Sequence, residues 1–292
     1  MMIQNNQKIF ISGSNGFIGS HIKKALIKNF ILLTPNKKKL NLNKINVLKN
    51  YLNKNKPDLV IHLATSTKFK TKKINEKRNQ IENTFNITKN LVKSINPECK
   101  LIIFFGSIEE YGNIKCPFKE TQNVNPITYY GRYKYKSYLY VSKYLKKKNL
   151  NYIWLRPSLT YGYGDNKERF LGHILNSIKK NKLFIIKPGE QIRDYIHIDD
   201  ICKVLKLIIK NYKKKFSCIL NISAQNYIKI RLIPKMIQAV IQQKVKYSFK
   251  KPNKKEINLC NSNRKLKELF PKLKFISFRK GLIKTLKDET IL

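Results

Sequence analysis

Residues 8–28 read KIFISGSNGFIGSHIKKALIK and combine three local patterns in one stretch. Lys8–Ser12 is a short apolar run typical of a buried strand, and Phe17–Lys28 repeats its apolar residues with a period near 3.6. Between them stand three glycines with the spacing Gly-x-x-Gly-x-x-Gly. The stretch therefore predicts a strand, a tight turn and an amphipathic helix in direct succession, which is the first unit of an α/β fold.

The same alternation continues along the chain. Further strands are expected over Ile31–Thr34, Asp58–Leu63, Lys100–Phe105, Tyr152–Arg156 and Cys218–Asn221, and helices over Ile45–Lys54, Glu76–Ser94, Tyr130–Lys148 and Asp199–Lys210. Asp58–Leu63 is a continuous apolar run, which is typical of a strand buried on both faces. This order of strands and helices predicts a parallel, doubly wound sheet.

Past Arg156 the elements become shorter and loops separate them. We expect a large domain formed by residues 1–160 with about 196–225, and a smaller mixed lobe formed by about 161–195 with 226–292. The length of 292 residues and the apolar content of 42% are sufficient for a sizeable core.

The formal net charge of +44 comes from 61 Lys and Arg residues against 17 Asp and Glu residues. The lysines are spread along the whole chain and accompany an excess of Asn and Ile, so a compositional bias explains them better than a nucleic-acid patch does. The chain shows neither a signal peptide nor an apolar run of ~20 residues, and we expect a cytoplasmic protein. The five cysteines and four histidines lack metal-ligand spacing, which predicts reduced thiols and no metal site.

The glycine turn has the arrangement of a dinucleotide-binding loop. Gly13 permits the tight turn, Gly16 lets the backbone approach a pyrophosphate, and Gly19 lets the helix lie close on the sheet. The helix N-terminus then offers unpaired N–H groups and a partial positive charge to the phosphates. The residues expected to hold the cofactor are Gly13, Asn15, Gly16, Phe17, Ile18, Gly19, Asn36, Lys37, Leu63, Ala64 and Lys134.

The end of the second strand indicates which dinucleotide binds. Residues 33–39 read LTPNKKK and lack the Asp or Glu that usually binds a free ribose 2′-hydroxyl. Lysines attract a 2′-phosphate, so NADP(H) is favoured. Three lysines in one loop are also background in so basic a chain, and NAD(H) stays open as the alternative.

Tyr130 and Lys134 form a Tyr-x-x-x-Lys pair at the start of an expected helix, a loop away from Ser107. Five such pairs occur in the chain, beginning at Tyr111, Tyr130, Tyr144, Tyr163 and Tyr247. Only the context of strand, loop and helix selects this one. Helical spacing places the ammonium near the phenol, whose pKa of ~10 must fall by about 3 for proton transfer near neutral pH. That fall corresponds to ~4 kcal/mol, and one cation at ~4 Å supplies about as much at an effective dielectric constant of 20. We expect Ser107, Tyr130 and Lys134 to be catalytic.

Together these features resemble a known family, the extended short-chain dehydrogenases of the NAD-dependent epimerase/dehydratase type, from Ser12 to about Gly281. The likeness rests on the glycine turn and on further segments, namely Asp58–Ala64, Gly106–Gly112, Tyr130–Lys134, Leu155–Pro157, Tyr161–Gly162 and Gly189–Asp200. It implies a Rossmann-type fold with a smaller substrate lobe, a nicotinamide cofactor and a nucleotide-diphosphate sugar as substrate. It also implies a homodimer through the helices of Glu76–Ser94 and Tyr130–Lys148.

The resemblance implies substrate contacts for single residues. The expected substrate-binding set is Ser107, Glu109, Tyr130 and Arg193. Arg193 would contact the nucleotide diphosphate, and its alternative role is a surface ion pair with Asp194 or Asp199. Glu109 suits a sugar contact and a solvated carboxylate equally well.

The subclass follows from the residues after Ser107. The 4,6-dehydratases carry an Asp-Glu pair where this chain has Ile108 and Glu109, and isoleucine cannot donate a proton. Gly106–Gly112 instead resembles reductases of nucleotide-linked 4-keto-6-deoxy sugars, of the GDP-6-deoxymannose reductase and CDP-abequose synthase types. Two departures bear on the sugar, since Tyr133 stands where Ser is common and Leu159 where an Asn often touches the substrate.

The expected function is NAD(P)H-dependent 4-keto reduction of a nucleotide-linked 6-deoxy sugar, in the biosynthesis of deoxysugars or surface polysaccharide. An NAD-dependent nucleotide-sugar 4-epimerase would use the same three catalytic residues and stays open. An alternative of another class is a non-enzymatic protein that senses a dinucleotide or binds nucleic acid.

Overall fold

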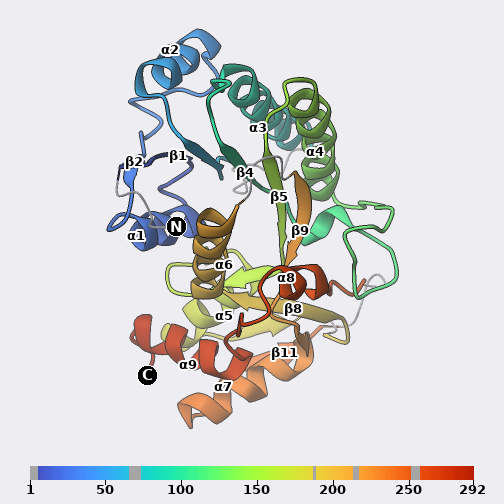
Figure 1. Ribbon diagram of the computed structural model, residues 1–292. Coiled ribbons are helices and arrows are strands. Elements are labelled where there is room, and N and C mark those ends of the chain that lie inside the picture. Colours follow the sequence, from blue (N-terminus) through green and yellow to red (C-terminus); the bar gives the residue numbers. More distant parts are fainter. Residues whose placement is uncertain (1–5, 66–73, 187–188, 213–216, 251–256) are drawn as a thin grey trace. The chain divides into compact units, whose positions relative to one another are not determined.

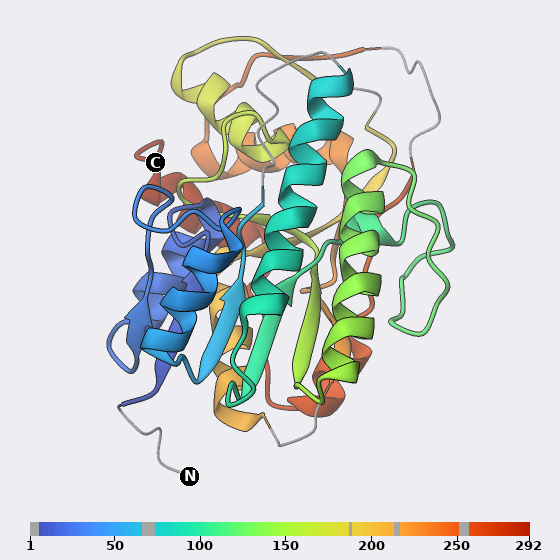
Figure 2. The same ribbon diagram turned by 90° about the horizontal axis from the view of Figure 1, so that it is seen from above.

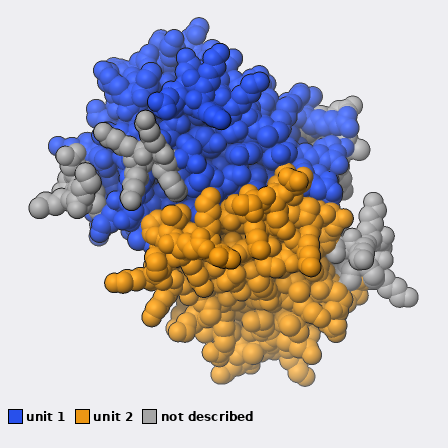
Figure 3. Space-filling view, turned by 45° about the vertical axis from the view of Figure 1, so that its right-hand side comes forward, with its two compact units in different colours: residues 1–110, 125–156, 205–220 blue, residues 111–124, 157–204, 221–292 orange. Residues whose placement is uncertain are grey.

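The computed structural model describes residues 6–65, 74–186, 189–212, 217–250 and 257–292, which form two compact units (Figure 3). Unit 1 contains residues 1–110, 125–156 and 205–220, and unit 2 contains residues 111–124, 157–204 and 221–292. The sequence division placed residues 111–124 with the large domain. In the structure they pack within unit 2, where the Phe118 N–H donates to the Cys260 carbonyl and the Tyr111 hydroxyl donates to Asn221.

Unit 1 is built on a six-stranded sheet with the order β2-β1-β3-β4-β5-β9 (Figure 1). Its strands are β1 (Lys8–Ser12), β2 (Ile31–Leu33), β3 (Leu59–His62), β4 (Leu101–Phe105), β5 (Tyr152–Pro157) and β9 (Cys218–Ile222). The pairs β1–β2, β1–β3, β3–β4 and β4–β5 are all parallel. This confirms the predicted Rossmann-type sheet. All four residues of β3 and all five of β4 are buried, as their continuous apolar sequences predict.

Helices cover both faces of this sheet. One face carries α2 (Ile45–Asn55), α3 (Ile74–Ser94) and α4 (Tyr129–Lys147), which lie side by side in Figure 2. The other carries α1 (Phe17–Leu26) and the second half of α6 (Ile198–Asn211) (Figure 1). The core between the sheet and α2–α4 contains Phe10, Val60, Ile102, Phe104 and Trp154. The predicted elements are therefore present, with ends shifted by at most two residues.

Unit 2 has a three-stranded sheet with the order β10-β8-β6. Here β8 (Ile192–His197) pairs in parallel with β6 (Leu159–Tyr161) and antiparallel with β10 (Asn226–Lys229). A second, parallel pair joins β7 (Phe184–Ile186) to β11 (Tyr247–Phe249). The unit also contains the first half of α6 and the helices α5 (Phe170–Lys179), α7 (Ile233–Ile241), α8 (Arg264–Leu269) and α9 (Phe278–Asp288), with a 3-10 turn η2 (Ile230–Leu232) before α7.

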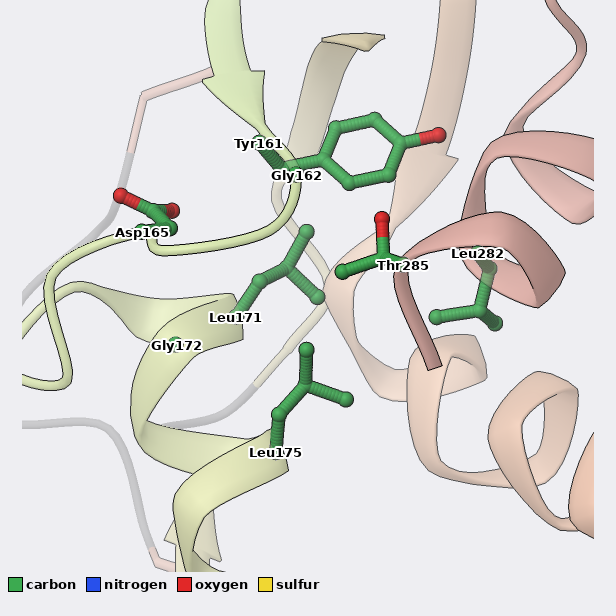
Figure 4. A pocket seen from close by; sticks show the side chains of 8 residues that line it. All are labelled: Tyr161, Gly162, Asp165, Leu171, Gly172, Leu175, Leu282 and Thr285. Carbon is green, nitrogen blue, oxygen red and sulfur yellow. The ribbon is translucent and has the colours of Figure 1, made fainter. Parts of the chain in front are cut away.

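A small pocket lies inside unit 2, where Leu171 and Leu175 of α5 face Leu282 and Thr285 of α9 beneath the ring of Tyr161 (Figure 4). Its space is about 10 Å³. That volume holds about one water molecule, so the pocket is a packing gap and no site for a cofactor or a sugar. Within the part of the chain that the structure describes, no helix has the length and apolar character that would let it cross a membrane.

Candidate active site

The glycine turn joins β1 to α1 and is fixed by two close approaches of main chain to main chain. Gly13 has a φ of +75°, and a Cβ there would lie 2.7 Å from the Ala64 nitrogen. A Cβ at Gly19 would lie 2.2 Å from the carbonyl oxygen of Gly13. Both contacts involve backbone atoms that cannot swing aside, so packing alone requires glycine at these two positions.

Gly16 differs from its two neighbours in the motif. Its N–H donates to the Gly13 carbonyl at 3.1 Å, and a Cβ at Gly16 would meet only that oxygen, at 3.4 Å. The fold therefore tolerates a side chain there. Gly16 is the N-cap of α1, where no side chain caps the helix and no acidic residue stands in the first turn. This helix N-terminus is open to an anion, and a bare Gly16 backbone suits the approach of a pyrophosphate.

The other predicted residues of the turn lie around this helix N-terminus. Asn15 and Gly16 are exposed, while Phe17 and Ile18 are half-buried. Leu63 and Ala64 follow β3, and the Leu63 N–H donates to the Ser12 carbonyl at 3.0 Å. The glycine turn and the end of β3 are therefore neighbours. They meet where the strand order reverses, because β2 lies on one side of β1 and β3 on the other. Ligands of open α/β sheets bind at such a switch point.

His62 is a buried residue to which the sequence assigned no separate role. Its Nδ1 lies 2.7 Å from the Ser12 hydroxyl and its Nε2 lies 3.0 Å from the Thr88 hydroxyl. Burial, together with the nearby Lys134 charge, lowers the pKa of His62 to about 3. The imidazole is therefore neutral and links β1, β3 and α3 beneath the turn.

The loop after β2 forms a turn around Asn36. The Asn36 side chain accepts from the Lys39 N–H at 2.9 Å, and its carbonyl accepts from the Leu40 N–H at 2.9 Å. Lys37, Lys38 and Lys39 are exposed. Residues 34–44 contain no Asp or Glu, so no carboxylate of this loop would repel a ribose 2′-phosphate.

The three predicted catalytic residues come from β4 and α4. Ser107 follows β4, is 9% exposed, and accepts a hydrogen bond on its hydroxyl from the Glu109 N–H at 3.1 Å. Lys134 lies on α4, and its Nζ donates to the Phe105 carbonyl at 2.6 Å. The same Nζ lies 5.7 Å from the centroid of the half-buried Tyr130 ring. The structure thus brings the lysine to the end of β4, two residues before Ser107, and places the phenol beside it.

The Lys134 ammonium is held in a buried environment. Burial lowers the pKa of Lys134 to about 8, and the Glu110 charge acts in the opposite direction. The side chain is therefore mainly protonated at neutral pH, as a cation that supports a phenol must be. Its buried position also strengthens its electrostatic effect on neighbouring groups.

A hydrogen-bonded cap ties α4 to the Ser107 loop. Thr128 is the N-cap of α4, accepts from the Gly131 N–H at 2.9 Å and donates to the Glu109 carboxylate at 2.7 Å. A Cβ at Gly131 would lie 2.3 Å from the Glu109 carbonyl, so helix and loop are in direct contact. Glu109 is half-buried in this arrangement. Its contact with a sugar stays a prediction.

A buried ionic network next to Ser107 was not predicted from the sequence. Glu110 closes the 3-10 turn η1 (Ile108–Glu110), and its carboxylate accepts from the Arg156 guanidinium at 2.8 Å and from the Trp154 indole at 2.9 Å. Glu110 is 0% exposed and Arg156 1% exposed. The signal was an arginine inside the otherwise apolar strand β5, since a buried charge requires a partner.

Arg193 lies on β8 of unit 2 and is half-buried. Its guanidinium donates to the carbonyls of Ile192 at 3.2 Å and Ile257 at 2.5 Å. The two carboxylates considered as its ion-pair partners contact other groups. Asp199 pairs with Lys284, and Asp194 accepts hydrogen bonds from the hydroxyls of Ser158 and Ser223.

Comparison with known proteins connects these features to a family. A sequence model described as "NAD dependent epimerase/dehydratase family" matches residues 9–223. ADP-L-glycero-D-manno-heptose-6-epimerase from Brachyspira hyodysenteriae is 28% identical over 242 residues, which cover 72% of this chain and 75% of that protein. CDP-abequose synthase from Salmonella typhimurium is 25% identical over 227 residues, which cover 70% and 71%. The solved structure of GDP-mannoheptose C4 reductase from Campylobacter jejuni, with NADP bound, has a TM-score of 0.84 at 20% identity and covers 98% of this chain and 99% of that one.

Proposed function

This chain belongs to the NAD-dependent epimerase/dehydratase family of enzymes that modify nucleotide sugars, and we propose that it reduces the 4-keto group of a nucleotide-diphosphate 6-deoxy sugar with NADPH. The observation that carries the proposal is the buried Lys134 ammonium. It donates to the carbonyl of Phe105, two residues before Ser107, and lies beside the Tyr130 ring. This arrangement supplies a proton donor, a cation to tune it and a hydroxyl to polarise a carbonyl.

The residues present fit a nicotinamide dinucleotide. Gly16 and the uncapped N-terminus of α1 would hold its pyrophosphate, and Leu63 and Ala64 lie beside the same turn. When bound, NADPH supplies the hydride that reduces the carbonyl carbon. Lys37 and the absence of carboxylates over residues 34–44 favour the phosphorylated cofactor, and NAD(H) is the alternative.

Ser107, Tyr130 and Lys134 each have one role in the rest of the reaction. Ser107 donates a hydrogen bond to the carbonyl oxygen of the sugar, which polarises the C=O bond. As that oxygen becomes an alkoxide, the Tyr130 phenol transfers its proton to it. Lys134 lowers the pKa of the phenol and stabilises the phenolate that remains. A proton from solvent then restores Tyr130.

The residue after Ser107 supports reduction over dehydration. Ile108 is 1% exposed and presents only hydrocarbon, so it cannot act as the acid of an elimination step. The likeness to CDP-abequose synthase points to the same reductive subclass. Arg193 would contact the diphosphate of the substrate, and Glu109 the sugar, as the family resemblance implies.

A nucleotide-sugar 4-epimerase is the second candidate. The relative that is 28% identical is itself named an epimerase, and an epimerase would use the same trio with retained NAD. Net consumption of the reductant separates the two reactions, because an epimerase returns the hydride to its product.

We further propose a homodimer through α3 and α4. Phe85 of α3 packs against Tyr140 of α4, with ring centroids 5.7 Å apart, and Leu139 of α4 is 49% exposed. Aromatic and aliphatic side chains on two neighbouring helices suit a symmetric contact with a second copy. The ammonium groups of Lys89 and Lys136 lie over the Phe85 ring at the same place.

The test is turnover of NADPH with a panel of 4-keto-6-deoxy sugars linked to GDP, CDP, dTDP and UDP. We expect one member to oxidise NADPH in step with formation of the reduced sugar, and Tyr130→Phe to lower kcat by about 10²–10⁴-fold. Tyr144→Phe is the matched control, because Tyr144 and Lys148 have the same spacing at the C-terminal end of this helix, where Lys148 is the C-cap. Interconversion of C4 isomers without NADPH loss would instead establish the epimerase.

A further inference from the structure

Glu110 is a buried carboxylate for which the proposed mechanism has no use. It is 0% exposed and closes η1, three residues after Ser107. One carboxylate oxygen accepts from the Ser107 N–H at 2.8 Å and from the Trp154 indole at 2.9 Å. The other accepts from the Arg156 guanidinium at 2.8 Å. Burial of a carboxylate has a substantial desolvation cost, so a function of the Glu110 charge would explain its presence.

Glu110 and Lys134 hold the two ends of one short backbone segment. Lys134 donates to the carbonyl of Phe105 at 2.6 Å, and Glu110 accepts from the N–H of Ser107. Gly106 lies between these two bonds, and a Cβ there would sit 2.2 Å from the Glu110 carboxylate oxygen. Glycine at this position therefore lets the carboxylate approach the backbone that carries Ser107.

The charges around Lys134 leave Glu110 as its supporting anion. Among the described residues, the Lys134 ammonium lies over the rings of Tyr130 and Tyr133 from α4, and it interacts electrostatically with Glu110 from η1 and His62 from β3. His62 is neutral, with a pKa of about 3, and burial raises the pKa of Tyr133. Glu110 is thus the acidic charge that favours the ammonium form of Lys134 against the cost of burial. Arg156 faces Glu110 from β5 and shares that charge.

We propose that Glu110 is a positioning residue of this site, which keeps Lys134 in its ammonium form and fixes the backbone of Ser107. The inference rests on the proposed function, since only a proton-transfer reaction needs this ammonium. Glu110 touches no reacting atom and acts through Lys134 and Ser107. Loss of its charge favours the neutral amine of Lys134. As the pH rises, Lys134 therefore loses its proton, and Tyr130 its supporting cation, at a lower pH than in the wild type.

The experiment measures the titration of the Lys134 side chain by NMR of 13Cε-labelled lysine in the full-length protein, assigned with Lys134→Met. Glu110→Gln keeps the shape and removes the charge. We expect it to lower the Lys134 pKa by about one unit, and to move the alkaline limb of the kcat–pH profile down by the same amount. Arg156→Gln removes the competing cation and should leave the Lys134 pKa unchanged or raise it. Glu98→Gln, with a side chain 71% exposed, is the matched control for net charge and should change neither.

Glu110→Gln leaves Arg156 buried without its carboxylate and can fail to fold. The double variant Glu110→Gln/Arg156→Gln removes both charges and retains hydrogen-bonding amides. Its Lys134 pKa should lie below that of Arg156→Gln, because these two proteins differ only in the charge of Glu110. An unchanged Lys134 titration between the wild type and Glu110→Gln, or between Arg156→Gln and the double variant, overturns the proposal. An equal fall of the Lys134 pKa in Arg156→Gln also overturns the proposal, because it would show that the intact network matters and the negative charge of Glu110 does not.

The titration needs no substrate, so it separates this inference from the proposed function. If the wild type reduces none of the sugars but the Lys134 pKa falls in Glu110→Gln, the electrostatic coupling stands and the assigned reaction is wrong. If the wild type reduces a sugar and the titration is unchanged, the reaction stands and the role of Glu110 is wrong.

Discussion

At the scale of the residue, the buried ammonium of Lys134 has a desolvation cost for the fold and a role in the proposed chemistry. Its Nζ is buried with one hydrogen bond to the Phe105 carbonyl, where burial lowers its pKa to about 8. A hydrocarbon side chain in the same place would avoid the desolvation cost. The proposed reaction explains why a cation occupies the position nonetheless.

The pH dependence of stability tests this buried charge. Between the folded pKa of about 8 and the ordinary value of 10.5, the unfolded chain holds a proton that folded Lys134 has lost, so stability rises with pH in this window. Below it both states are protonated and the full cost is present. The free energy of unfolding of the wild type should therefore gain up to about 3 kcal/mol over Lys134→Met between pH 8 and pH 10.5.

Urea unfolding of both proteins at a series of pH values measures this gap. Lys136→Met, which removes an exposed lysine of the same helix, is the control for loss of a charge. A gap between wild type and Lys134→Met that stays constant across the window would show that Lys134 is not buried as a cation.

The sequence singles out Tyr130 and Lys134 among five equivalent pairs, because strand, loop and helix context is local information, and their catalytic role stays a prediction. It could not assign Glu110. The neighbouring Glu109 has the same side chain but bonds the Thr128 hydroxyl, while Glu110 meets Arg156 from a strand 46 residues away. Which of two adjacent carboxylates turns inward depends on the backbone of η1, which short-range patterns do not determine.

At the scale of elements, two glycines of the turn between β1 and α1 are needed for different reasons. Packing requires Gly19, and we expect cofactor binding to require Gly16. Gly19→Ala places a Cβ 2.2 Å from a main-chain oxygen and should lower the free energy of unfolding by about 1–3 kcal/mol. Gly16→Ala meets only an ordinary contact at 3.4 Å, so the unfolding free energy without ligand should stay within about 0.5 kcal/mol of the wild type. Its NADPH dissociation constant should nevertheless rise by about tenfold, because the added methyl group stands where the pyrophosphate approaches.

Thermal unfolding without ligand and NADPH titration by fluorescence measure the two effects separately. The two variants are controls for each other, since Gly19→Ala should mainly lower the stability and Gly16→Ala should mainly lower the NADPH affinity. Unaltered NADPH affinity in Gly16→Ala would contradict the placement of the pyrophosphate at the N-terminus of α1.

The N-cap of α4 gives a second prediction at this scale. Thr128 accepts from the Gly131 N–H and donates to Glu109, so Thr128→Ala removes the cap and leaves both groups without this partner. We expect a loss of about 1 kcal/mol in the free energy of unfolding. Thr128→Ser keeps the hydroxyl and should restore most of it. Urea unfolding of the three proteins checks this, and equal losses in Thr128→Ala and Thr128→Ser would show that the methyl group matters instead of the hydroxyl.

The elements of the large sheet were predictable because helices with a 3.6-residue period over ten or more positions alternate with short apolar runs. This alternation identifies even the three-residue strand β2. The lobe was not resolved into elements, since β6, β7 and β11 have only three residues each and too few positions for a period to appear. Residues 111–124 illustrate a different limit. They pack in unit 2 through Phe118 and Tyr111, contacts with partners more than 100 residues away that no local pattern reveals.

For the whole molecule, the charge of +44 acts on every association. Anionic cofactors and nucleotide sugars are attracted to such a surface, whereas two copies of the chain repel each other. Added ions screen both interactions. Salt should therefore weaken the binding of the anionic ligands and strengthen the association of two copies.

The proposed dimer should therefore tighten with salt. At low ionic strength the repulsion between two strongly cationic copies opposes contact through α3 and α4. Near 1 M salt the screening length falls to ~3 Å and the apolar contact prevails. Sedimentation at increasing salt should show a growing dimer fraction. Leu139→Arg, at a position 49% exposed on α4, should abolish the dimer, whereas Leu183→Arg, 58% exposed in unit 2, adds the same charge and should leave it intact. Equal dimerisation of both variants would place the contact elsewhere on the surface.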